Sequence, residues 1–358
     1  MDVIDDFSSE GEFHSSGTFT LSVAESRARL SQFQMESGLF LTKWVQAGVA
    51  LNSQKIRLDV SDRLTATLMG VGNCKLKVDA LLGHLQSPWE LVPSSPEASL
   101  VLGILASQAQ GPSPLTVHLK DPDGGLLIQV LAGEARAHRT PSSGLDWSLQ
   151  ISLSGASGCD FRSILQQRCG YCPVPIELGN EVMESPWDNP GEEEYRVAEA
   201  FLESDGPARL LLPDPATRAS WCVLENGHYS ARNSADPRAF LLCYPGGRRC
   251  GWDGALAVSA DLQGPSRLLW VKGGVIIEEE QVDLGTPGML GVVSAHYLQT
   301  DLSQFKLRRD EAYQARLALL REQSDQLLRR VFDCPLPVRV PARAGKSVEE
   351  WIQQRAQG

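Results

Sequence analysis

The sequence predicts an α+β fold of two modules, and three observations carry this prediction. The chain has 358 residues, whereas a single hydrophobic core stops growing beyond about 250–300 residues. Its 42% hydrophobic and 22% charged residues are typical of a globular protein. Apolar residues recur with helical spacing in some blocks and with strand spacing in others. We expect helices on one side of an antiparallel sheet, followed by a second α/β module.

The N-terminal elements run from a tail to a buried helix. Residues 1–16 carry five acidic and no Lys or Arg side chains, so we expect a flexible acidic tail. Residues 19–21 alternate as a short strand, and Ser22 with Glu25 forms a capping box at the start of a helix. The next helix, over residues 39–51, is almost entirely apolar, which predicts burial on several sides.

Strand periodicity dominates the rest of the first module. Residues 56–60 and 64–68 alternate between apolar and polar side chains, which predicts two antiparallel strands. A glycine turn follows at Gly70 and Gly72, and residues 121–125 have the composition of a hairpin turn. The other expected elements are helices over residues 78–85 and 96–107 and strands over residues 115–120, 126–131 and 147–153.

The second module is expected to begin between residues 160 and 190. A short helix over residues 161–168 leads into a proline-rich segment, and prolines from Pro335 onward end one long helix over residues 309–332. The strands expected between these helices cover residues 210–212, 221–224, 240–244, 255–259, 268–271, 275–279 and 290–294. The predicted division is a tail at 1–16, a first module at 17–160, a second module at 161–335 and a C-terminal extension at 336–358.

Charge and hydropathy argue against several classes of partner. The net charge of −11 and the pI near 5.1 disfavour binding to phosphate backbones and anionic lipids, so we expect no nucleic-acid partner. No stretch approaches the roughly 18 consecutive apolar residues of a membrane helix. Residues 1–16 lack the basic and apolar segments of a signal peptide. We therefore expect a cytoplasmic protein that does not engage a membrane.

The order of elements across residues 39–85 is a buried helix, two strands, a glycine turn and a helix. This order resembles the nucleotide-binding domain of the GHKL (Bergerat-fold) ATPases, the superfamily of the heat-shock protein 90 chaperones, the MutL proteins and the histidine kinases. In that family the buried helix carries a Glu that activates water and an Asn that holds magnesium on the phosphates. The matching run here is residues 43–50, with Lys43 in place of the Glu and no Asn.

The next motif of the family, D-x-G-x-G, resembles the run from Leu68 to Gly72. Gly70 and Gly72 match, but Leu68 stands where the family has an Asp that accepts a hydrogen bond from adenine. A glycine-rich lid would fall near residues 86–100, where the sequence has prolines and serines and no glycine. By this resemblance, Gly70 and Gly72 are remnants of a nucleotide site.

Two further resemblances lie downstream. Residues 164–176 resemble the junction at which the middle domain of these proteins begins, and residues 291–311 resemble the chaperone segment in which a strand leads to an arginine at a helix start. In the chaperones that arginine reaches the terminal phosphate, and Arg309 matches it here. Because the other phosphate ligands are missing, we expect Arg309 to pair locally with Asp310 or Glu311.

The cysteines and the arginines allow two readings each. Cys169 and Cys172 have the spacing of half a zinc knuckle or of a redox pair, but in a large chain without a signal peptide we interpret the eight cysteines as mostly reduced and buried. The long helix carries a basic stripe that could meet an acidic partner, although we expect a solvated face. That stripe consists of Arg316, Arg321, Arg329 and Arg330.

The resulting prediction is a pseudo-ATPase: a non-catalytic, chaperone-like or scaffold protein with an eroded nucleotide site, acting through a protein partner. It has no catalytic residue, no metal ligand and no cofactor, and Gly70, Gly72 and Arg309 are its only remnant nucleotide-binding positions. One alternative is a client-remodelling chaperone of the heat-shock protein 90 type that binds and hydrolyses ATP with magnesium. Another is a zinc-dependent structural adaptor.

Overall fold

The structure is a computed structural model, and it describes part of the chain. The described residues are 38–61, 63–70, 76, 81, 83–85, 95–109, 113–121, 124–131, 134–141, 148–154, 160–187, 196–204, 209–212, 220–225, 228–233, 242–243, 251–259, 264–301 and 304–333. The expected tail at 1–16, the strand and helix over residues 19–33, Gly72 and the extension at 336–358 lie outside them.

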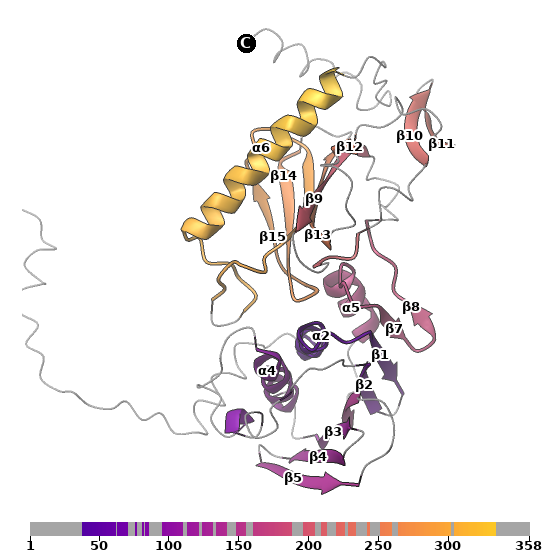
Figure 1. Cartoon of the computed structure of the whole chain (residues 1–358), viewed down its shortest axis with the longest axis vertical. Coiled ribbons are helices and arrows are strands. Elements are labelled where there is room, and N and C mark those ends of the chain that lie inside the picture. Colours follow the sequence, from indigo (N-terminus) through magenta and orange to yellow (C-terminus); the bar gives the residue numbers. More distant parts are fainter. Residues whose placement is uncertain are drawn as a thin grey trace, which may run out of the picture.

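An eight-stranded sheet forms the base of the first module (Figure 1). Strand β1 (Lys55–Val60) pairs antiparallel with β2 (Arg63–Met69), as the alternation of their side chains predicted. The neighbouring strands are β3 (Leu115–Asp121), β4 (Gly124–Leu131), β5 (Glu134–Thr140) and β6 (Ser148–Ser154). The order across the sheet is β5-β4-β3-β6-β2-β1-β7-β8.

Two helices pack together on this sheet. Helix α2 (Phe40–Ala50) and helix α4 (Pro96–Ala109) share one hydrophobic core with β1, β2, β3 and β6. They approach closely because Gly103 lies against Trp44: a Cβ on Gly103 would be 2.5 Å from the Trp44 ring. Figure 1 shows both helices between the sheet and the second module.

The segment after residue 160 extends the first sheet. Helix α5 (Phe161–Cys169) begins where the Asp160 carboxylate accepts a hydrogen bond from the Ser163 N–H. Strand β7 (Ile176–Leu178) then pairs parallel with β1, and β8 (Glu181–Val182) pairs with β7. Strands β7 and β8, which lie in a segment expected in the second module, thus extend the first sheet. The division of the chain at residue 160 remains a prediction.

A six-stranded sheet forms the second module, in the order β12-β9-β13-β16-β14-β15. Helix α6 (Glu311–Asp333) packs on it through Tyr313, Leu317, Leu320 and Leu327. The strands are β9 (Arg196–Ser204), β12 (Leu242–Cys243), β13 (Gly251–Ser259), β14 (Ser266–Lys272), β15 (Val275–Val282) and β16 (Met289–Ser294). A separate ribbon contains β10 (Ser220–Glu225) and β11 (His228–Asn233).

The α+β fold is confirmed, with local corrections. The strand expected at residues 210–212 is wrong, because this segment is irregular: Leu210 and Leu212 are buried, and the Leu211 N–H donates to the Tyr171 carbonyl. Strand β5 was not predicted. Its side chains are mostly exposed and show no apolar alternation, and its pairing with β4 defines it. Strands β9 and β11 were also not predicted.

Candidate functional site

Helix α2 buries a lysine where the two modules meet. The Lys43 side chain is 0% exposed. Its ammonium donates hydrogen bonds of 3.0 Å to the Gln46 Oε1 atom, one turn along α2, and of 3.0 Å to the Gln304 Oε1 atom of the second module. The ammonium also lies 4.5 Å from the centre of the Phe305 ring, which allows a cation–π contact.

Burial makes the charge of Lys43 unfavourable. Desolvation and, to a lesser extent, the positive charge of Lys272 lower the pKa of its ammonium from 10.5 to about 7, although the Asp301 carboxylate opposes the shift. Desolvation likewise lowers the pKa of the Lys272 ammonium. Two lysines from different modules therefore repel each other across the junction, and neutral acceptors bind the ammonium of Lys43.

Polar contacts help to join the modules here. Gln46 accepts from Lys43 and donates through Nε2 to the Lys272 carbonyl oxygen at 2.9 Å. Gln304 has a φ of +60°, a left-handed conformation that is uncommon for a residue other than glycine. The turn that contains Gln304 thus has a strained backbone at the position where its side chain contacts α2.

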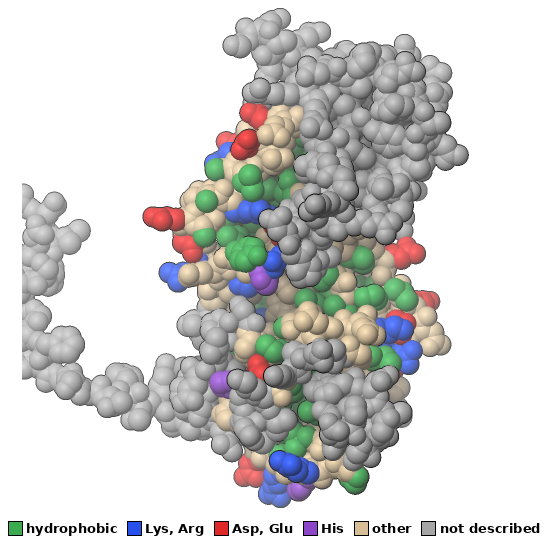
Figure 2. Space-filling model, in the orientation of Figure 1, with side chains coloured by type: hydrophobic (Ala, Val, Ile, Leu, Met, Phe, Trp, Pro, Cys, Tyr) green, Lys and Arg blue, Asp and Glu red, His purple; other side chains and the backbone are tan. Residues whose placement is uncertain are grey.

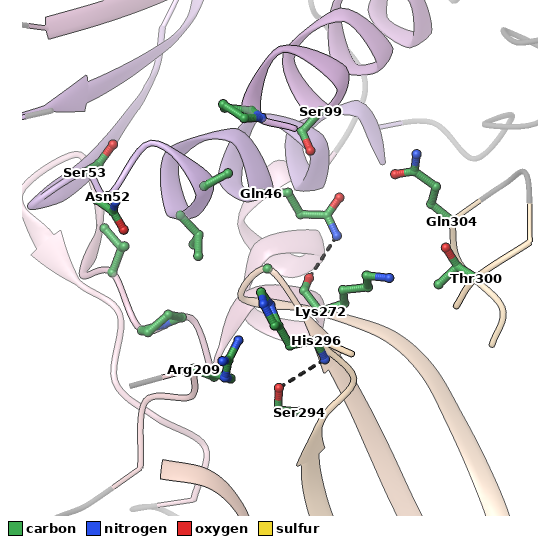
Figure 3. Close-up of a pocket in the computed structure, with 16 residues that line it drawn as sticks. Gln46, Asn52, Ser53, Ser99, Arg209, Lys272, Ser294, His296, Thr300 and Gln304 are labelled. Carbon is green, nitrogen blue, oxygen red and sulfur yellow. Dashed lines mark hydrogen bonds between the residues drawn. The ribbon is translucent and has the colours of Figure 1, made fainter. Parts of the chain in front are cut away.

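A cavity of about 550 Å³ lies beside these contacts, between the two modules (Figure 3). The first module contributes Gln46, Asn52, Ser53 and Ser99, with apolar surface from Val49, Ala50 and Val174. The second module and its connection contribute Arg209, Lys272, Ser294, His296, Thr300 and Gln304. Among the described residues that line the cavity, one is Arg, one is Lys, one is His, and none is Asp or Glu.

Arg209 belongs to a cluster in which two guanidinium groups share one carboxylate. Its Nε lies 3.7 Å from the Asp253 Oδ1, and Arg316 on α6 donates to the Asp253 Oδ2 at 2.6 Å. Arg209 also donates to the Tyr297 hydroxyl at 2.7 Å and stacks on that ring. The pKa of His296 is lowered by desolvation and by the charges of Arg209 and Lys272, so neutral His296 is favoured next to these cations.

Gly70 lies outside this cavity lining. Its φ of +63° requires the left-handed conformation, and a Cβ there would be 2.6 Å from the Gln54 Oε1 atom. This backbone conformation favours glycine at position 70 whether or not a nucleotide binds. Gly72 lies outside the described residues, and the assignment of the two matching glycines to a nucleotide site stays a prediction.

Arg309 also lies outside the cavity, and its expected local partners were wrong. It forms ion pairs of 2.7 Å with Glu278 and 2.6 Å with Glu280, both on β15, and its guanidinium stacks over the Tyr313 ring at 4.3 Å. The partners are on a neighbouring strand because α6 begins beside β15. Its predicted role toward a phosphate stays a prediction.

Arg316 on α6 is only partly solvated, whereas Arg321 is exposed. The Arg316 side chain is 19% exposed because it pairs with Asp253, and Arg321 donates through Nε to the Asp283 carbonyl oxygen at 2.9 Å. The side chains of Arg329 and Arg330 lie outside the described residues. A fully solvated basic face was therefore the wrong expectation for Arg316.

The cysteine interpretation is confirmed where the structure describes it. Cys169 and Cys172 are free and buried, and desolvation raises the pKa of the Cys172 thiol to about 12. Within the described part of the chain, no group of three or more His, Cys, Asp or Glu side chains is placed to hold a metal ion. No helix in that part is long and apolar enough to cross a membrane.

Sequence reasoning missed most of the residues around the cavity. Lys272 precedes the turn glycines Gly273 and Gly274, and Gln304 lies in an irregular segment before α6. Neither a lysine at the end of a strand nor a glutamine in a loop signals a site by itself, and the lining residues are far apart in the sequence. The anomaly at Lys43, a charged residue in an apolar helix, was the one usable signal.

Comparisons with known proteins support the fold. No protein-family model matches the chain, and no characterised protein matches it in sequence. Among solved structures, the B subunit of the DNA gyrase from Myxococcus xanthus matches with a TM-score of 0.50 and 10% identity, over 86% of this chain and 96% of that chain. At this identity the match shows the fold alone. It confirms a GHKL-like fold, and the closer resemblance to heat-shock protein 90 stays a prediction.

Proposed function

We propose that this GHKL-like protein does not hydrolyse ATP and acts as a chaperone-like or scaffold protein through a protein partner in the cytoplasm. The observation that carries the proposal is Lys43. It occupies the α2 position at which the family resemblance places a water-activating Glu, and its ammonium is bound by Gln46 and Gln304.

Lys43 is unsuited to the role of that glutamate. A general base must lie within hydrogen-bond reach of the water that it deprotonates. The Lys43 side chain has no exposed surface, and its nitrogen already donates to two amide oxygens. A lysine with a lowered pKa can serve as a base elsewhere, but here the surrounding side chains exclude the substrate water.

The donor set of α2 does not fit a magnesium ion. Mg²⁺ prefers oxygen ligands, usually one or two carboxylates together with phosphates and waters. The helix offers Thr42, Lys43 and Gln46 at its polar positions. The Thr42 hydroxyl donates to the Leu39 carbonyl oxygen, and Gln46 is engaged by Lys43 and Lys272. Helix α2 therefore offers no carboxylate that would hold Mg·ATP for hydrolysis.

The first test is phosphate release from Mg·ATP by the full chain, with Lys43→Met as the matched variant. We expect no turnover in either protein and no shift of the thermal unfolding midpoint with millimolar Mg·ATP. Magnesium-dependent turnover that Lys43→Met abolishes would overturn the proposal.

The chaperone-like role needs a separate assay. The full chain, without nucleotide, should reduce the light scattering of a heat-unfolded model client at a stoichiometric ratio. Equal scattering with this protein and with an inert protein of similar charge would contradict the chaperone-like function and leave the scaffold function.

The alternative is an ATP-hydrolysing chaperone of the heat-shock protein 90 type. The observation in its favour is the left-handed turn at Gly70 within a GHKL-like fold, at a position that matches a family glycine. The turnover assay above decides between the two functions.

A further inference from the structure

The cavity between the modules has an unusual charge for this protein. The whole chain has a net charge of −11, yet the described residues that line the cavity include Arg209, Lys272 and His296 and no carboxylate. Figure 2 shows basic and His side chains gathered at mid-height on the face in view, where the modules meet. The described lining of this cavity is therefore basic, although the protein as a whole is acidic.

We propose that this cavity binds a small organic anion bearing carboxylate or phosphate groups, held by Lys272 and Arg209. The site lies apart from the remnant nucleotide positions, because neither Gly70 nor Arg309 lines it. The proposal does not depend on the function proposed above.

Among the described residues, the cations near the cavity wall have few anionic partners. Arg209 and Arg316 share the single carboxylate of Asp253. Lys272 donates to the neutral Leu298 carbonyl oxygen at 2.7 Å, which uses one of its three N–H groups. A bound anion would complete the pairing of these cations and reduce the repulsion between Lys272 and Lys43.

The remaining lining supplies hydrogen bonds and apolar contact. The Ser53 hydroxyl is buried and has no hydrogen-bond partner among the described residues, although Ser53 lines the cavity. Val49, Ala50 and Val174 give an apolar wall. Ligand sites commonly combine such walls with a few polar groups in a volume of about 300–1,000 Å³, and this cavity measures about 550 Å³. The ligand is therefore larger than a bare ion.

A ligand in this cavity would contact both modules. Figure 3 shows Ser99, on a helix of the first module, on the opposite side of the view from His296 of the second, while Gln46 is hydrogen-bonded to the Lys272 carbonyl oxygen. A ligand that binds only when the two modules are packed together stabilises that packed arrangement by mass action. The anion would therefore strengthen the packing of one module on the other.

The test is thermal unfolding of the full chain with pyrophosphate or with citrate, at constant ionic strength set with chloride. At about ten times its Kd, an effective probe should raise the unfolding midpoint by about 3 °C. If only pyrophosphate raises the unfolding midpoint, the ligand carries phosphate groups. If only citrate raises it, the ligand carries carboxylate groups.

Three variants make the test specific. Lys272→Met and Arg209→Met should each lose the shift, whereas Arg136→Met, which removes an exposed cation from β5, should keep it. If Lys272→Met does not fold, Arg209→Met carries the comparison. The absence of a shift with both probes, or an equal shift in the cavity variants, would overturn the proposal. ATP turnover would contradict only the proposed function.

Discussion

The ammonium of Lys43 donates a hydrogen bond of 3.0 Å to the side-chain oxygen of Gln304, a residue 261 positions later in the chain. Both partners deviate from what their local structure favours: Lys43 is a fully buried cation in an apolar helix, and Gln304 has a left-handed backbone. Such deviations persist where the surrounding structure holds them. The pair therefore provides a direct test of how the two modules are held together.

Replacing Lys43 by Met should stabilise the protein at low pH. The folded pKa of about 7 lies below the ordinary 10.5, so between these values the unfolded chain binds the additional proton and stability rises with pH. Below about pH 7 the full penalty of the buried charge is present. Lys43→Met should thus raise the free energy of unfolding by roughly 2–3 kcal/mol at pH 6.

The gain in free energy of unfolding from Lys43→Met should shrink steadily toward pH 10. Denaturant titrations at several pH values measure this gain. The difference between variant and wild type cancels the pH-dependent contributions that the two proteins share. Lys306→Met, an exposed lysine in the same segment as Gln304, is the control and should show no such trend. A pH-independent difference for Lys43→Met would contradict the lowered pKa.

A double-mutant cycle should detect coupling between Lys43 and Gln304. Hydrogen bonds to charged groups contribute about 1.5–3 kcal/mol, so Lys43→Met and Gln304→Ala should be non-additive by about that amount at pH 6. Above pH 9 the amine is neutral and the coupling should fall below about 1.5 kcal/mol. Additive effects at pH 6 would mean that the contact contributes nothing measurable.

Gly103→Ala should loosen the packing of α4 on α2. The new methyl group would lie 2.5 Å from the Trp44 ring, which is fully buried, so the helices must separate, and overpacking of this kind destabilises by about 1–3 kcal/mol. The control is Gly83→Ala, where nothing lies within 4 Å of the added carbon and the higher helix propensity of Ala should be neutral or slightly stabilising. Denaturant midpoints of the two variants give the comparison, and equal values would contradict close helix packing.

Arg309→Met should destabilise the second module. It removes two short ion pairs to β15 and the stacking on Tyr313, and it leaves Glu278 and Glu280 as neighbouring acids at 19% and 13% exposure. We expect a loss of about 1–2 kcal/mol. Arg267→Met, which breaks the exposed pair with Glu279, should cost less than about 1 kcal/mol. Thermal unfolding measures both, and a larger loss for Arg267→Met would contradict the assignment.

The two described cysteine thiols should resist alkylation in the folded protein. The thiolate is the reactive form, and burial raises the pKa of both Cys169 and Cys172. Iodoacetamide at pH 8 should leave them unmodified in the native state and modify them in guanidinium chloride, as peptide mass spectrometry would show. Rapid labelling of native Cys172 would favour the redox-pair reading of the C-x-x-C spacing.

The sequence by itself determined the elements whose burial follows a local period. The apolar run of α2, the alternation in β1 and β2 and the helical spacing of α6 were predicted because a buried face repeats along a helix or strand. The two matching glycines and the order of elements also predicted a GHKL-like fold. The substitution of Lys43 for an acidic residue was visible without any structure.

Only the tertiary structure decided how distant segments meet. Strand β5 exists through its pairing with β4, and β7 joins β1 across more than a hundred residues. Arg309 pairs with β15 and not with its neighbours in sequence. The cavity brings together Gln46, Arg209 and Lys272. Contacts of this kind depend on which surfaces pack together, and local periodicity carries no information about partners that lie far apart in the chain.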